Sequence, residues 1–240
     1  MCGSPVPLSP NKRTWTLRRC APVLVLAALT GACSSAPAPA TFDLSAPSSR
    51  IRGAAGVQVL VAEPAALQAL STQQILVKDA SGAISFLGGG QWADNLPRLI
   101  QTRLINTFEN SSQLRGVARP STGAVADAQL ISELRRFEIA TPGNEAVVEI
   151  SAKIVSEQNG RIVNGRIFRG RIPASAVDAA NAARALDEAL SVVMLDIVRW
   201  VSASQLPRRD APPEATSQAP TPEGTNPRAE AGKADPAAKS

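Results

Sequence analysis

The amino-acid sequence predicts a single α/β (α+β) domain in which a mixed, mainly antiparallel sheet packs against two main helices, with a disordered C-terminal tail. Three observations predict this fold class. Several short runs have the alternation or the continuous apolar character of strands. Two longer segments carry apolar residues at helical spacing, and from Pro207 onward the composition becomes rich in proline and alanine. Residues 41–206 remain, which is the length of one domain.

The first part of this domain is predicted to consist mainly of strands. The run "VQVLVA" at 57–62 is apolar throughout and predicts a buried strand. A short helical piece is expected around Ala65–Leu70. The runs "QQILVKD" and "AISFLG" are rich in β-forming residues and are separated by Ala80-Ser81-Gly82, so they predict a hairpin.

The first main helix is predicted to begin between Trp92 and Asn95. Pro97 fits in its first turn, where the missing N–H leaves no hydrogen bond unmade. The triplet Gly88–Gly90 before the helix suggests a phosphate-binding loop, but it lacks the lysine and the spacing of such loops. We interpret it as a flexible connector. The apolar face of the helix recurs every four residues at Trp92, Leu96, Ile100, Leu104 and Phe108.

Three strands are predicted next, at 128–139, 146–155 and 161–172. Residues 146–155 alternate with the period of two that is typical of a half-buried strand. Asn159-Gly160 predicts the turn of a hairpin. The returning strand carries four arginines, which either solvate a sheet face and protect its edge or meet lipid headgroups or an acidic partner: Arg161, Arg166, Arg169 and Arg171.

The last element of the domain is predicted to be a helix from about Ala174 to Ala203, with Ser175 as a candidate N-cap. We expect its apolar stripe to pack on the domain's own sheet. The same spacing would also suit a short coiled-coil interface with another helix. The stripe consists of Leu186, Leu190, Val193, Ile197 and Trp200.

Residues 207–240 are predicted to be a disordered tail. They include seven prolines, eight alanines, five basic and five acidic residues, and no large apolar side chain. Such a segment cannot offset the entropy cost of becoming ordered. It is either a tether that reaches through peptidoglycan or a passive solubilising tail.

Residues 1–32 have the organisation of a secretory signal peptide. Four basic residues precede the apolar run Ala21–Leu29. That run is about half the length that a membrane-spanning helix needs. This organisation fits a plain cleaved signal or twin-arginine export through Arg18-Arg19. The residues around Cys33 indicate a third possibility, a lipoprotein signal.

Gly31 and Ala32 directly before Cys33 resemble the bacterial lipobox. In a lipobox the signal is cut between these last two residues, here Ala32 and Cys33. The cysteine then carries a diacylglycerol, and its new amine is acylated with a fatty acid such as palmitate. We therefore expect lipidation at Cys33, with residues 33–40 as lipidated cysteine and short linker. Two or three acyl chains hold a protein at a membrane, and Ser34 in place of an aspartate favours the periplasmic face of the outer membrane.

The composition excludes several classes of function. The chain has no histidine and no tyrosine, and Cys33 is the only cysteine after residue 32. These counts exclude Ser-His-Asp and Cys-His catalysis and zinc sites built on His or Cys, so we expect no enzyme, no metal and no cofactor. Carboxylate catalysis needs only two acids, but Asp187-Glu188 and the pair Glu133 and Glu138 are interpreted as solvated surface charges. Without residues 1–32 the chain contains 21 basic and 20 acidic residues. This nearly even charge balance gives no support to nucleic-acid binding.

The order of these parts resembles the ABC-type transport auxiliary lipoprotein family, which includes the paraquat-inducible-type lipoprotein. The likeness covers about residues 41–203 and rests on the first strand "TFDL", then "VQVLVAEPAAL", "QWADNLPRLI", "ADAQLISELRRFEI", "GRIFRGRIPA" and the closing "IVRWV".

The resemblance implies a non-catalytic outer-membrane lipoprotein that works with an ABC transporter and an inner-membrane protein bearing mammalian-cell-entry (MCE) domains. Such a system moves lipids across the periplasm, and this chain would dock or receive the MCE tunnel. Some family members form rings, so a homo-oligomer is possible. The partner-binding surface, the lipid and the direction of transport stay open. The alternative function is an envelope or cell-wall assembly lipoprotein that uses its Pro/Ala tail to reach through peptidoglycan.

Overall fold

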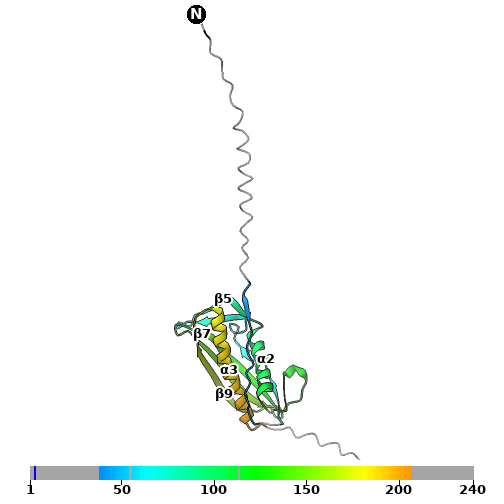
Figure 1. The fold of residues 1–240 in the computed structure, drawn as a ribbon. Helices are drawn as coiled ribbons and strands as arrows, with labels where there is room; N and C mark the ends of the chain where they lie inside the picture. The colour runs from blue at the N-terminus through cyan, green and yellow to red at the C-terminus, as the bar shows by residue number, and fades with distance from the viewer. Residues whose placement is uncertain (1–2, 4–37, 54–55, 113, 207–240) are drawn as a thin grey trace, which may run out of the picture.

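The structure, a computed structural model, describes residue 3 and residues 38–53, 56–112 and 114–206. Within these residues nine strands form one sheet, and the helices α2 and α3 lie together on one of its faces (Figure 1). The predicted α/β fold with a mixed sheet and two main helices is confirmed. The elements are β1 (Ala40–Phe42), β2 (Gln58–Val61), β3 (Ala65–Ala66), β4 (Gln74–Lys78), β5 (Ile84–Trp92), α2 (Leu96–Ser111), β6 (Gly116–Ala118), the 3-10 turn η1 (Pro120–Thr122), β7 (Ala128–Ala140), β8 (Glu145–Ser156), β9 (Ile162–Pro173) and α3 (Ala179–Ala203).

Strand β7 organises the sheet because both of its edges are paired. On one edge it pairs antiparallel with β8, which pairs antiparallel with β9. On the other edge the short strands β2, β3 and β4 pair with it in parallel, one after another along its length. β5 extends the sheet antiparallel to β4, while β1 and β6 add parallel edges on β5 and β2. Two of the three antiparallel pairings join the long strands β7, β8 and β9, whereas each of the five parallel pairings covers only two or three residues.

The core lies between this sheet and the two helices. Alternate residues of β8 turn towards α3 and are buried, including Val148 and Ile150. The predicted apolar stripe of the last helix packs on the sheet, where Leu190 and Ile197 are completely buried. Helix and sheet approach each other closely at Gly170, where an added Cβ would lie 2.3 Å from the carbonyl oxygen of Ala189. Glycine is therefore needed in β9 to let α3 lie against the backbone of the strand.

The first main helix begins at Leu96, after the predicted start. Trp92 is instead the last residue of β5. It is fully buried and makes an edge-to-face contact with Phe137, with ring centroids 5.6 Å apart. Its place in the four-residue apolar period therefore reflects the shared core and not the helix itself.

The interpretation of Gly88–Gly90 as a flexible connector is wrong. All three glycines lie inside β5, and Gly89 has a φ of +81° where the pairing with β4 changes register. Gly90 pairs with Ala40 of β1, and a Cβ there would come within 2.6 Å of the Phe42 ring. The glycines allow a bent strand and a close first strand.

The start of the last helix and the structure of residues 65–70 also differ from the prediction. The last helix begins at Ala179, and its N-cap is Asp178, whose side chain accepts a 3.0 Å hydrogen bond from the N–H of Asn181. Ser175 lies outside the helix, and its hydroxyl donates to the Asn181 side chain. The helical piece expected around Ala65–Leu70 is strand β3 followed by a turn, because Ala65 and Ala66 pair with β7.

Candidate functional site

The segment that follows the predicted anchor is fastened to both helices. Asp43 forms an ion pair with Arg103 of α2. The N–H and the hydroxyl of Ser45 each donate a 2.6 Å hydrogen bond to the carboxylate of Asp187 in α3. The hydrogen bond from Arg103 lowers the pKa of Asp43 below its ordinary value, despite partial desolvation. These contacts hold the segment from Asp43 to Ser45 against both α2 and α3.

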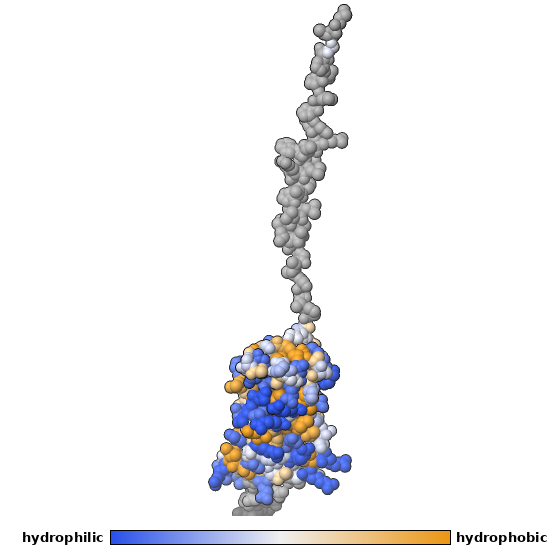
Figure 2. All heavy atoms as spheres, turned by 90° about the vertical axis from the view of Figure 1, so that its left-hand side faces the viewer, coloured by the Kyte–Doolittle hydropathy of each residue, from blue (hydrophilic) through white to orange (hydrophobic). Residues whose placement is uncertain are grey.

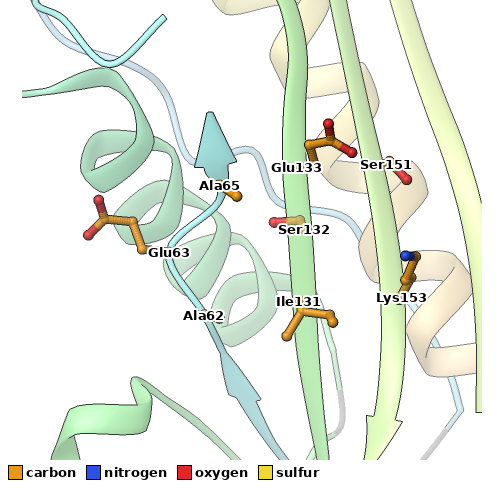
Figure 3. Close-up of a pocket in the computed structure, with 8 residues that line it drawn as sticks. All are labelled: Ala62, Glu63, Ala65, Ile131, Ser132, Glu133, Ser151 and Lys153. Atoms are coloured by element: carbon orange, nitrogen blue, oxygen red, sulfur yellow. The ribbon is translucent and has the colours of Figure 1, made fainter. Parts of the chain in front are cut away.

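A shallow hollow of about 310 Å³ lies beside β3 on the open face of the sheet, the face opposite the helices. Ile131 and Glu133 of β7 and Lys153 of β8 point out of the sheet together, while Ser132 points into the gap beside β3 (Figure 3). The carboxylate of Glu63 points away from this group. The hollow thus combines an apolar floor with one cation and one anion.

The open face is covered by ion pairs. Arg169 donates to Glu149 at 2.7 Å, and Arg171 donates to Glu145 at 2.8 Å. Arg166 instead lies on the side of β9 that faces α3, over the Phe168 ring and 5.3 Å from its centroid. Three of the four arginines of the returning strand therefore have partners within the domain. Figure 2 shows one side of the molecule, where hydrophilic residues gather in patches bordered by hydrophobic ones.

Glu138 also differs from the sequence interpretation. It was expected to be a solvated surface charge, but it is only 3% exposed. The Nε–H of Arg136 donates a 2.7 Å hydrogen bond to it. A buried carboxylate needs such a charged partner, so this pair has a structural role. Glu133 does lie at the surface, where Arg135 pairs with it at 3.2 Å.

A second hollow, of about 440 Å³, lies on the other side of Ala62 and Glu63, against α2 and η1. Its lining includes Arg98, Gln101 and Arg119. Sequence reasoning did not identify these residues as a site, because they are far apart in the chain and match no spacing motif. The one local signal in the sequence that could have pointed to this hollow is Glu63-Pro64, which interrupts the apolar run of β2.

No group of three or more His, Cys, Asp or Glu side chains within residues 38–53, 56–112 and 114–206 could hold a metal ion. In the same residues no helix is long and apolar enough to span a membrane. Ala32, Cys33 and the tail 207–240 lie outside the described residues, so cleavage, lipidation and disorder remain predictions.

Comparison with known proteins agrees with this fold. Residues 41–198 match the family described as the ABC-type transport auxiliary lipoprotein component. An uncharacterized protein of Bradyrhizobium diazoefficiens is 36% identical over 166 residues, which are 67% of this chain and 44% of that protein. The chain therefore spans less than half the length of this relative.

Two solved structures share the fold. A Xanthomonas campestris protein of the DUF330 family superposes with a TM-score of 0.63 at 26% identity, over 68% of this chain and 94% of that one. The crystal structure of another uncharacterized protein gives a TM-score of 0.53 at 13% identity, over 68% of this chain and 99% of the other, and supports the fold alone.

Proposed function

The chain belongs to the family of ABC-type transport auxiliary lipoprotein components, and we propose that it is the outer-membrane lipoprotein of an ABC transport system whose inner-membrane partner carries MCE domains. In this function it docks or receives the periplasmic MCE tunnel and supports lipid movement without catalysing a reaction. The observation that carries the proposal is the extent of the family match, residues 41–198, which includes the sheet and nearly all of both helices.

The short distance between Cys33 and the fold supports a position close to a membrane. Cys33 is followed by the seven residues Ser34–Ala40, the last of which is the first residue of β1, and a chain of that length extends at most ~25 Å. With acyl chains on Cys33, the fastened segment from Ala40 to Ile51 would hold the whole domain near the bilayer surface. The blue first strand and the orange C-terminal end of α3 lie at opposite ends of the domain (Figure 1), so the chain leaves the domain at the end away from β1.

The proposal is tested by recovery of the protein from bacterial envelopes. A C-terminally tagged chain and its Cys33→Ser variant are expressed at equal levels in a deletion strain, cross-linked and purified. We expect the MCE protein to be recovered with the wild-type chain from the outer-membrane fraction, and much less of it with the variant. Recovery without an MCE protein, together with unchanged outer-membrane lipid in the deletion strain, would contradict the proposal.

The tail separates this function from envelope or cell-wall assembly. That alternative is favoured by the position of the C-terminal end of α3, which precedes the tail and lies at the end of the domain away from β1 (Figure 1). Truncation after Leu206 should leave lipid transport nearly intact if the domain is the working part. A strong envelope defect after truncation, with the MCE protein still recovered, would favour the assembly function.

A further inference from the structure

The hollow between α2 and η1 contains a guanidinium group that is held in place by neutral partners. Arg119 donates to the side-chain oxygen of Gln101 at 3.2 Å and to the hydroxyl of Thr102 at 2.8 Å. Gln101 is only 6% exposed and is itself fixed by a 2.9 Å hydrogen bond to the carbonyl oxygen of Val61. Because neither partner carries a charge, the positive charge of Arg119 is positioned without being neutralised.

A second guanidinium lines the same hollow. Arg98 approaches Asp94 only at 3.9 Å, and both side chains are largely exposed. A pair of this kind contributes little energy, so Arg98 is free to turn towards a ligand. Ser121 adds a hydroxyl to the lining. Two arginines and a hydroxyl are the groups that recognise phosphate, since the planar guanidinium matches two phosphate oxygens at once.

Glu63 gives the hollow a charge of the opposite sign. It lines the hollow together with both arginines, yet among the described residues no ion pair joins it to either of them. Opposite charges that share a cavity without pairing are complementary to a ligand that carries both signs. Ala62 and Glu63 also line the first hollow, which lies on the other side of this segment and where Ala65 and Ile131 provide apolar surface.

We propose that this hollow binds the headgroup of a zwitterionic phospholipid, phosphoethanolamine. Its phosphate lies against Arg119 and Arg98, its ammonium lies near Glu63, and its glyceride crosses the segment 62–63 towards Ala65 and Ile131 of the first hollow. The volume of about 440 Å³ is within the range of small-molecule sites. The inference rests on the proposed lipid-transport function only for the expectation that the ligand is a lipid.

The test uses the mature chain from residue 33 to residue 240 with Cys33→Ser, so that the result does not depend on lipidation. The probes are dihexanoyl phosphatidylethanolamine, dihexanoyl phosphatidylglycerol and inorganic phosphate, and binding is measured by NMR chemical-shift titration. We expect the phosphatidylethanolamine to bind about tenfold more tightly than the other two probes, which corresponds to about 1.4 kcal/mol.

Two variants separate the two charges of the ligand. Arg119→Gln should weaken both lipids about tenfold, and Arg119→Lys should not restore binding, because an ammonium lacks the fork that spans Gln101 and Thr102. Glu63→Gln should leave phosphatidylglycerol unchanged and remove the preference for phosphatidylethanolamine. Arg184→Gln, on the exposed side of α3, is the matched control and should change nothing. Thermal unfolding of each variant shows that it is folded.

Several results would overturn the proposal: no binding of either lipid, inorganic phosphate binding as tightly as phosphatidylethanolamine, or an unchanged preference in Glu63→Gln. None of these results depends on the MCE partner. Loss of the MCE protein in the envelope experiment with lipid binding intact would refute the docking function and leave this site in place.

Discussion

The two faces of the sheet differ in what they contribute. On the face towards α3, side chains such as Ile150 and Phe168 are buried among the apolar residues of the helix. One residue along the same two strands, Ser151 and Ile167 pair on the open face, where the neighbouring pair is Glu149 and Arg169. Because successive strand residues point to opposite faces, one pair of strands both builds the core and presents a charged surface.

This difference indicates where the stability of the domain originates. Burial of a large apolar side chain contributes several kcal/mol, whereas an exposed ion pair contributes about 0–1 kcal/mol. The helix face therefore accounts for most of the stability, and the open face is available for contacts with a partner or a ligand. The predictions below compare matched positions on the two faces.

Replacement of Ile150 by alanine should have the largest effect. It is 1% exposed beneath α3, so the change leaves a cavity and should lower the free energy of unfolding by about 2–5 kcal/mol. Ile167→Ala, on the adjacent strand but facing outward, should cost at most about 1 kcal/mol. Urea unfolding followed by circular dichroism measures both values. Equal losses would mean that the open face is covered in solution.

Gly170→Ala tests the contact between β9 and α3. The new Cβ would lie 2.3 Å from a helix carbonyl oxygen, so the helix must move, at a cost of up to about 3 kcal/mol. Gly165→Ala in the same strand would meet its nearest atom at 3.5 Å and should be nearly neutral. A smaller shift of the melting temperature for Gly170→Ala than for Gly165→Ala would contradict the packing described here.

Two arginines compare a buried ion pair with an exposed one. Arg136→Ala leaves the carboxylate of Glu138, 4% exposed, without its charged partner and should cost about 1–3 kcal/mol. Arg169→Ala removes a pair from an arginine that is 61% exposed and should cost less than about 1 kcal/mol. The double variant Arg136→Ala with Glu138→Gln should recover part of the loss. No recovery would show that Arg136 acts through packing alone.

The smallest effect is expected at Asp43, next to the predicted anchor. The hydrogen bond from Arg103 lowers its pKa below the ordinary value of 3.8. The stabilising contribution is therefore fully present above pH 3.8 and is lost as the pH falls through the lower pKa of the folded state. Asp43→Asn should lower stability at pH 7 by less than about 1 kcal/mol, since Asp43 is 54% exposed. The difference in stability between the variant and the wild type should therefore shrink as the pH falls below 3.8, and a constant difference between pH 7 and pH 2 would contradict this assignment.

The strands were predictable because their signals are local. Alternation in residues 146–155 and the Asn159-Gly160 turn predicted the β8–β9 hairpin, and the continuous apolar run at 57–62 predicted β2. Hairpin strands are set by neighbouring residues, so a short window of sequence contains the information.

The boundaries of the helices and the hollows depend on contacts between distant residues. Trp92 shares the apolar period of α2 but belongs to β5, because its ring packs on Phe137. Glu138 is buried because of the strands around it, which its local sequence does not show. The hollow with Glu63 and Arg119 exists only because β2 and β6 are adjacent strands of the folded sheet.

The anchor is tested most directly by mass spectrometry of the protein purified from envelopes. The account predicts that the mature chain begins at Cys33 and that this residue carries a diacylglyceryl thioether and an amide-linked acyl chain, with no residue of 1–32 remaining. A mature N-terminus at any other residue, or a free thiol on Cys33 in protein that fractionates away from membranes, would contradict it.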